Sequence, residues 1–138
     1  MYHAPVTEAT PITFAGALPP QADVVIIGGG VIGVCTAIYL AGQGLRPALI
    51  EKGRIAGEQS SRNWGWIRQQ GRDADELPIM VEAIGRWKDL AAQTNVDFGL
   101  RQGGVTYMAR TAKDLAGFER FLPHARKQGV DTRLLNSA

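Results

Sequence analysis

The stretch ADVVIIGGGVIGVCTAIYLAGQGLRPALIE, residues 22–51, decides the fold of this chain. It opens with a short β-branched run, residues 22–27, of the kind that forms a central parallel strand buried on both faces. Residues 31–43 have helical length and mostly small or apolar side chains, so we expect a helix buried against a sheet and closed by Gly44. A second strand is expected at residues 47–51. Strand, glycine turn, helix and strand predict a right-handed βαβ unit of a Rossmann-like α/β fold with a parallel sheet.

The glycines between the first strand and the helix form a G-x-G-x-x-G motif at Gly28, Gly30 and Gly33. Each glycine has a physical task in a dinucleotide site. Gly28 permits a tight turn off the strand, Gly30 lets a pyrophosphate approach bare backbone, and Gly33 lets the helix pack close to the strand. The pyrophosphate would be held by unpaired N–H groups at the start of the helix, where Val31 and Ile32 lie.

Glu51, at the end of the second strand, lies 18 residues beyond Gly33. A carboxylate at this position accepts hydrogen bonds from ribose hydroxyls, and its charge disfavours a 2′-phosphate. FAD or NAD is therefore favoured over NADP. The alternative is a glycine turn that binds nothing, which the surrounding strand, helix and acidic residue make the weaker interpretation.

Beyond Glu51 the sequence predicts a long polar loop and four further elements. Residues 52–76 are too many for a plain connector in a compact domain. Residues 77–93 carry apolar side chains at the spacing of an amphipathic helix, namely Met80, Ile84, Trp87 and Leu90 or Ala91. We expect a β-hairpin over residues 98–110, a second amphipathic helix over residues 112–128 and one more strand over residues 130–135.

Composition indicates an ordinary soluble globular domain of 138 residues, with 45% hydrophobic and 20% charged residues. The net charge of +2 comes from basic and acidic residues spread along the chain, which argues against a nucleic-acid or anionic-membrane surface. Residues 1–22 contain several prolines and no Lys or Arg, so we predict a flexible N-terminal arm and place the folded part at residues 23–138. No run is long and apolar enough to span a bilayer.

Several residue types that carry chemistry elsewhere are discounted here. The single cysteine, Cys35, cannot form an internal disulfide, and a reducing, cytoplasmic location fits best. Within the predicted helix it is a packing residue. His3 and His124 are not paired with a nucleophile or carboxylate, so no metal site is expected. The acidic residues Asp73, Asp75 and Glu76 indicate a favourable charge at a helix N-terminus.

The chain resembles the FAD-dependent oxidoreductases related to D-amino-acid oxidase, glycine oxidase and sarcosine oxidase. The resemblance begins with DVVIIGGGVIGVCTAIYLAGQG and LIEK, and it continues through GEQSSRNWGWIRQ. It implies that Gly28, Gly30, Gly33 and Glu51 contact the ADP moiety of FAD and that Lys52 lies beside the ribose. It also implies a loop running toward the flavin ring, made of Ser60, Ser61, Arg62, Asn63, Trp64 and Gly65. For each individual side chain of this loop, a place in the core or on the surface is as good an interpretation as contact with the cofactor.

The function implied by the resemblance is oxidation of the C–N bond of an amino acid or secondary amine, with hydride transfer to the flavin. In that family the substrate-binding sheet comes from later sequence, so no catalytic residue is named. A non-catalytic dinucleotide-binding fragment or subunit that needs a partner is a second hypothesis, and an NAD-dependent dehydrogenase is a third. An incomplete sheet leaves an edge and an apolar face uncovered, so we expect self-association or a completing partner chain.

Overall fold

The computed structural model describes residues 6–135; His3 and the C-terminal residues 136–138 lie outside the described part. The chain divides into two compact units, Met1–Gly65 and Trp66–Ala138, and each is described by itself. The proposed boundary between an N-terminal arm and a folded part at residue 23 stays a prediction. No helix in the described part of the chain is long and apolar enough to cross a membrane.

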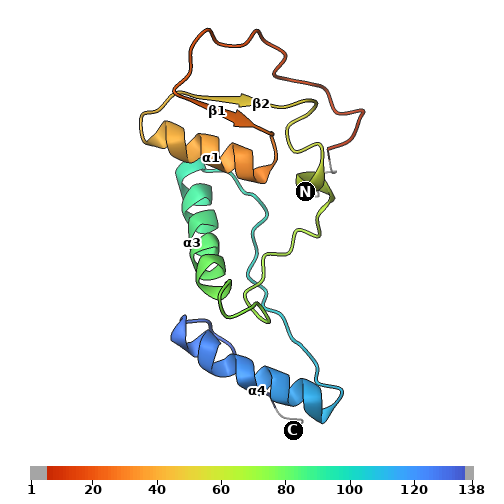
Figure 1. Cartoon of the computed structure of the whole chain (residues 1–138). Coiled ribbons are helices and arrows are strands. Elements are labelled where there is room, and N and C mark those ends of the chain that lie inside the picture. The colour runs from red at the N-terminus through yellow and green to blue at the C-terminus, as the bar shows by residue number, and fades with distance from the viewer. Residues whose placement is uncertain (1–5, 136–138) are drawn as a thin grey trace. The chain divides into compact units, whose positions relative to one another are not determined.

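The first unit contains the predicted βαβ arrangement. Strand β1 (Val24–Ile27) leads into helix α1 (Val31–Gly42), and strand β2 (Pro47–Ile50) follows. The two strands pair in parallel, with Val24 opposite Pro47, and α1 lies against them (Figure 1). Asp23 fixes the start of this pairing, because its Oδ2 accepts the backbone N–H of Arg46 at 2.8 Å and its Oδ1 pairs with Arg46 Nη2 at 2.8 Å.

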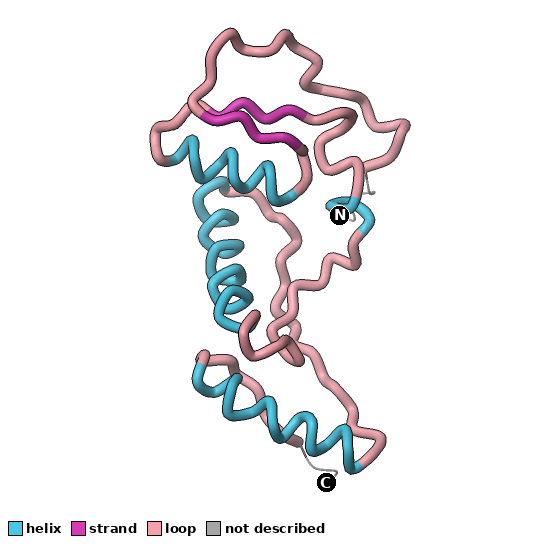
Figure 2. The backbone as a smooth tube through the Cα atoms, viewed as in Figure 1, coloured by secondary structure: helices cyan, strands magenta, loops and turns pink. Residues whose placement is uncertain are grey.

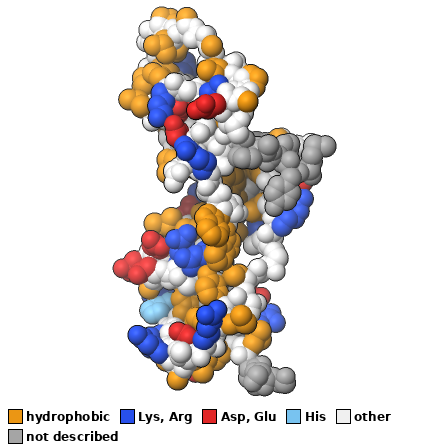
Figure 3. Space-filling model, turned by 90° about the vertical axis from the view of Figure 1, so that its right-hand side faces the viewer, with side chains coloured by type: hydrophobic (Ala, Val, Ile, Leu, Met, Phe, Trp, Pro, Cys, Tyr) orange, Lys and Arg blue, Asp and Glu red, His pale blue; other side chains and the backbone are white. Residues whose placement is uncertain are grey.

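The expectation that the first strand is buried on both faces is wrong. Exposure alternates along β1, and the side chains of Val25 and Ile27 are 58% and 88% exposed. Within residues 6–135 the sheet has two strands, and α1 covers one of its faces, so alternate side chains face away from the helix. Helix α1 is likewise open on one side and contains no fully buried residue. Figure 3 shows hydrophobic side chains at the surface.

The polar loop after β2 contains one short element that the sequence did not predict, helix α2 (Gln59–Arg62). The rest of this segment is loop, as the backbone trace shows (Figure 2). Helix α2 is capped by Asn63, whose Nδ2 donates to the Ser60 carbonyl at 2.6 Å and whose Oδ1 accepts the Gly65 N–H at 2.6 Å. An asparagine that bonds backbone on both sides favours a turn over further helix.

The second unit is helical. Helix α3 (Leu77–Thr94) confirms the predicted amphipathic helix and buries Leu77 and Leu90. Helix α4 (Ala112–Lys127) confirms the second one. Its start is fixed by a capping box that the sequence analysis missed: Thr111 Oγ1 accepts the Asp114 N–H at 3.2 Å, and Asp114 Oδ2 accepts the Thr111 N–H at 2.9 Å.

The predicted hairpin over residues 98–110 is wrong: the structure places no strand there. A local turn replaces it. Gly99 has a φ of +70°, its N–H donates to Asp97 Oδ1 at 2.8 Å, and Arg101 Nη2 donates to Asp97 Oδ2 at 2.8 Å. Side-chain to backbone bonds of this kind compete with strand pairing.

The predicted strand over residues 130–135 is also wrong. The N–H of Val130 donates to the Ala125 carbonyl at 2.9 Å, so it closes the end of α4 together with Gly129, which has a φ of +70°. Further on, Thr132 Oγ1 bonds to Gln70 Oε1 at 2.6 Å. This segment is therefore used to finish a helix and to bind a loop of the second unit.

Candidate functional site

The glycine turn between β1 and α1 has the backbone that the motif requires. Gly28 adopts a φ of +110°, which side chains rarely tolerate. A Cβ on Gly33 would lie 1.9 Å from the Gly28 carbonyl oxygen, and one on Gly30 would lie 3.0 Å from Ser60 Oγ. The close approach of α1 to the end of β1 therefore needs glycine at position 33, as the spacing predicted.

The start of α1 offers backbone donors without any acidic side chain in the first turn. The N–H of Val31 donates to Ser60 Oγ at 2.8 Å. The first bond within the helix is donated by Val34 to the Gly30 carbonyl, so the N–H groups of Ile32 and Gly33 have no partner inside the helix. Such amides, together with the positive end of the helix dipole, favour a phosphate group.

Glu51 lies directly after β2 and reaches back to the glycine turn. Its Oε2 accepts the Gly29 N–H at 2.7 Å, and its Oε1 accepts the Gly53 N–H at 2.9 Å. These two bonds, the Gly29 one first, hold the pKa of the Glu51 carboxyl below its ordinary value, and the charge of Lys52 adds to the effect. The carboxylate is therefore ionised at neutral pH and ready to accept further donors.

Gly29, the central glycine of the turn, has a role that sequence reasoning missed. It is buried, and its carbonyl accepts the N–H of Ala56 at 2.9 Å. A Cβ at Gly29 would lie 3.0 Å from Glu51 Cβ and 2.5 Å from Ile55 Cδ1. Because the motif leaves this position unspecified, only the run of three consecutive glycines could have indicated it.

An ion-pair network lies beside Glu51. Lys52 Nζ is 3.1 Å from Glu58 Oε1, and Arg62 pairs with the other oxygen of Glu58. The hydrogen bond from Lys52, followed by the positive charges of Lys52 and Arg62, lowers the pKa of the Glu58 carboxyl. This network links the residue after Glu51 to the start of α2, which carries Ser60.

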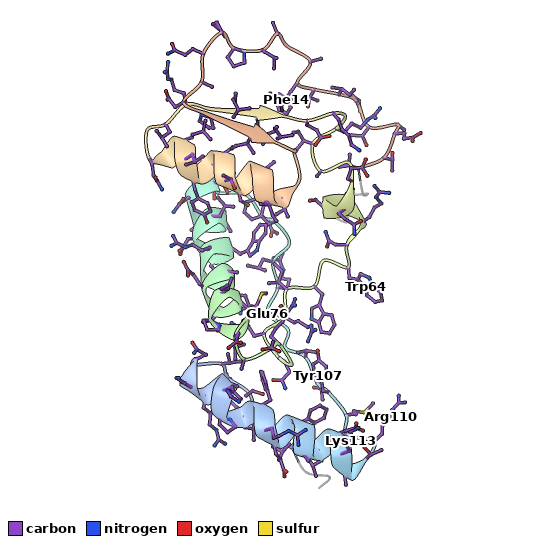
Figure 4. The ribbon with its side chains drawn as sticks, in the orientation of Figure 1. Phe14, Trp64, Glu76, Tyr107, Arg110 and Lys113 are labelled. Carbon is purple, nitrogen blue, oxygen red and sulfur yellow. The ribbon has the colours of Figure 1, made fainter. Side chains whose placement is uncertain are left out.

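Residues of the N-terminal segment before β1 contact the segment that follows β2. Arg54 donates to the carbonyls of Glu8 and Thr10, and Ser61 Oγ donates to the Val6 carbonyl at 3.4 Å. Ser61 is thus directed to the N-terminal segment, whereas Ser60 faces the glycine turn. Trp64 is 94% exposed (Figure 4).

An open pocket of about 610 Å³ lies over the glycine turn. It is lined by the end of β1, the turn, the first half of α1 and α2, that is by Ile26, Ile27, Gly28, Gly30, Val31, Ile32, Gly33, Thr36, Gln59, Ser60 and Asn63. Of the predicted site residues, the pocket collects Gly28, Gly30, Val31, Ile32, Gly33, Ser60 and Asn63. Outside its lining lie Glu51, Lys52, Ser61, Arg62, Trp64 and Gly65. The roles of all these residues toward a cofactor stay predictions.

In the second unit, an aromatic cluster surrounds Arg68. Its guanidinium lies 5.5 Å from the centre of the Trp66 ring, and its Nη1 donates to the Tyr107 hydroxyl at 3.2 Å. Tyr107 stacks on Trp66 with ring centres 6.5 Å apart and meets Phe118 of α4 edge to face at 6.2 Å. Arg68 therefore packs within this unit, beside Tyr107, which is labelled in Figure 4.

Two of the residues discounted from the sequence, Cys35 and His124, lie inside helices. Cys35 is half-buried in α1, and burial raises the pKa of its thiol, which suits packing better than reactivity. His124 lies in the last turn of α4. Among residues 6–135, no group of three or more His, Cys, Asp or Glu side chains is placed to hold a metal ion.

In a comparison with known proteins, residues 23–138 match the model of one family, DAO, which is described as FAD dependent oxidoreductase. The chain is 35% identical over 115 residues to the sarcosine oxidase subunit beta of Arthrobacter sp, covering 82% of this chain and 28% of that protein. L-amino acid deaminase from Proteus vulgaris superposes with a TM-score of 0.77 at 34% identity, covering 86% of this chain and 28% of that one.

L-proline dehydrogenase from P. horikoshii superposes with a TM-score of 0.79 at 30% identity, covering 86% of this chain and 31% of that one. The chain therefore spans less than a third of the length of these similar proteins.

Proposed function

Because this chain belongs to the family of FAD dependent oxidoreductases, whose model matches residues 23–138, we propose that it binds the ADP part of FAD at its glycine turn. The observation that carries the proposal is the turn itself. It combines the left-handed Gly28, the open amides of α1 and an ionised Glu51 on one βαβ unit. These groups match a pyrophosphate and a ribose in charge and hydrogen bonding.

Each group of the site has a separate part in this proposal. The amides of Ile32 and Gly33 bind the pyrophosphate at the start of α1. Glu51 accepts hydrogen bonds from the ribose hydroxyls of the adenosine, with Lys52 beside it. Ser60 lies at the pocket over the turn, and the loop that follows, made of Ser61, Arg62, Asn63, Trp64 and Gly65, runs toward the flavin.

The reaction that we propose for the whole protein is oxidation of the C–N bond of an amino acid or secondary amine. When bound, the flavin supplies the hydride acceptor for this chemistry. The proposal is supported by three relatives that are named for such substrates: a sarcosine oxidase subunit, an L-amino acid deaminase and an L-proline dehydrogenase. The contribution of this chain is to bind and orient the cofactor, and we assign it no catalytic residue.

We further propose that the chain works with a completing partner chain or with a second copy of itself, in the cytoplasm. The relative from Arthrobacter sp is named as one subunit of its oxidase, and the open face of β1 exposes Val25 and Ile27. The single cysteine supports a reducing compartment. Size-exclusion chromatography tests the association: a monomer at high concentration in the absence of other chains would contradict self-association.

Cofactor retention tests the central proposal. The purified chain is mixed with FAD or with NAD, passed through a desalting filter, and its absorbance spectrum is recorded. We expect flavin bands to stay with the protein after FAD and nothing to stay after NAD. Retention of NAD alone would favour an NAD-dependent dehydrogenase, and retention of neither would contradict the assignment of a cofactor site to this chain.

A further inference from the structure

One carboxylate, that of Glu51, joins the glycine turn to the loop after β2. Gly28 donates its N–H to the Ile50 carbonyl at 2.8 Å, which ends the pairing of β1 and β2 and places Glu51 beside the turn. Glu51 then accepts the N–H of Gly29 on one oxygen and that of Gly53 on the other, at 2.7 and 2.9 Å. One side chain therefore bonds the backbone of the turn and the backbone of the loop after β2.

A third bond completes this arrangement. The Gly29 carbonyl accepts the N–H of Ala56 at 2.9 Å. Ala56 has a φ of +59°, in the left-handed region that favours glycine. The backbone N–H and C=O of Gly29 are thus both bonded to residues 51–56. The side chains of Ile55 and Glu51 fill the space around Gly29.

Three consecutive glycines have more conformational freedom than any other tripeptide, so a turn made of them needs outside contacts to adopt one shape. We propose that Glu51 is a positioning residue: its carboxylate, by accepting the N–H groups of Gly29 and Gly53, holds the glycine turn in its cofactor-binding shape before any cofactor arrives. This inference deepens the proposed function, on which its consequence for FAD binding rests.

The double role is compatible with the stereochemistry of a carboxylate. Each oxygen has two lone pairs, so a carboxylate that accepts two N–H groups can still accept two ribose hydroxyls. A glutamine cannot replace it, because its NH₂ group would face one of the two backbone N–H donors. Glu51→Gln therefore loses the positioning of the turn as well as the ribose contact.

The test uses the full chain without cofactor. Amide proton shifts of Gly29 and Gly53 are followed by NMR as the pH is lowered, together with the side-chain carboxyl carbon of Glu51. Hydrogen bonding by the two amides, and to a smaller extent the charge of Lys52, lowers the pKa of this group from 4.5. We expect both amide shifts to titrate with the Glu51 carboxyl carbon, at one midpoint below 4.5. Amide shifts that do not follow the Glu51 carboxyl carbon would overturn the inference.

A matched pair of variants gives a second measurement. Glu51→Gln should abolish the titration of both amides and speed hydrogen exchange about tenfold at Gly29 or Gly53, whichever N–H then faces the glutamine NH₂ group, the loss expected for a bond to a charged acceptor. Glu58→Gln removes a neighbouring carboxylate that bonds Lys52 rather than the turn, and it should change neither. Equal effects of both variants would also overturn the inference.

The proposed function and the inference can fail separately. If FAD is not retained but the amides titrate with Glu51, the positioning role stands and the cofactor assignment falls. If FAD is retained but the Gly29 and Gly53 amide shifts do not titrate with the Glu51 carboxyl, the inference is wrong and the proposed function stands.

Discussion

A side chain at Gly33 would collide with the carbonyl oxygen of Gly28, because its Cβ would lie 1.9 Å from that atom. This is a backbone atom of the residue directly after β1, so it cannot move without changing how the chain passes from the strand into α1. The contact explains why the motif ends in glycine five residues after it begins.

Gly33→Ala should therefore destabilise the first unit by about 3 kcal/mol, the upper range for overpacking, and should abolish FAD retention. Urea unfolding and filtration measure the two effects. Gly42→Ala is the matched control: Gly42 ends the same helix with open space around its Cβ position, so alanine there should be neutral or stabilise by up to about 1 kcal/mol. Equal losses from both variants would contradict the close-contact explanation.

Ser60→Ala should weaken FAD binding about tenfold, because the Ser60 hydroxyl lines the pocket and, by accepting the Val31 N–H, holds α2 against the start of α1. Ser61→Ala, its neighbour, removes only long bonds to the Val6 and Glu58 carbonyls and should change FAD affinity less than threefold (about 0.6 kcal/mol). Fluorescence titration with FAD compares the two. A larger loss of FAD affinity for Ser61→Ala than for Ser60→Ala would contradict the assignment of Ser60 to the FAD pocket.

Arg68→Ala should destabilise the second unit by about 2 kcal/mol, because it removes hydrogen bonds to the Gln70 and Gly71 carbonyls together with the contact to the Trp66 ring. Tyr107→Phe, which removes only the hydroxyl bonded to Arg68, should cost about 1 kcal/mol or less. Tryptophan emission during urea unfolding measures both. A neutral Arg68→Ala would mean that the cluster does not stabilise the unit.

Thr111→Ala should destabilise α4 by about 1 kcal/mol through loss of its capping box. Thr106→Ala changes the same residue type at an exposed loop position outside any helix and serves as control. Circular dichroism during thermal unfolding measures the difference. If the two variants unfold alike, the cap contributes nothing measurable.

Asp97 should make stability fall at low pH. The hydrogen bond from Arg101, then that from Gly99, lowers the pKa of its carboxyl from 3.8 to about 2. A folded pKa below the unfolded one means that the stabilisation is present above pH 3.8 and is lost as the pH falls through about 2. Asp97→Asn should remove the dependence of the urea unfolding midpoint on pH between about 2 and 3.8. Asp131→Asn, which alters an exposed pair with Arg133, should leave that dependence unchanged.

The sequence predicted the βαβ unit and both long helices because their signals are local. The glycine spacing and the apolar periodicity of Met80, Ile84 and Trp87 each act within a few turns of chain. The burial of β1 could not be predicted in the same way, because it depends on which elements cover each face of the sheet. A run such as VVII indicates a strand but does not say how many neighbours the strand has.

The errors after residue 95 have a different cause. The predicted hairpin and final strand do not form, and backbone groups there bond to side chains and to the end of α4. Asp97 and Val130 each take a local partner that a pattern of hydrophobicity does not reveal. At the site, Glu51 was found for its charge and position, whereas its bonds to Gly29 and Gly53 needed coordinates.

The contacts described above for the glycine turn are all made within one span of the chain. The strand pairing from Val24, the Glu51 bonds to Gly29 and Gly53, and the Ser60 bond to Val31 all lie between residues 23 and 60. During synthesis, therefore, the glycine turn and the residues that bond to it are all present once residue 60 has left the ribosome. These contacts need no segment beyond residue 60, so this part of the site can assemble while the remaining chain is still being made.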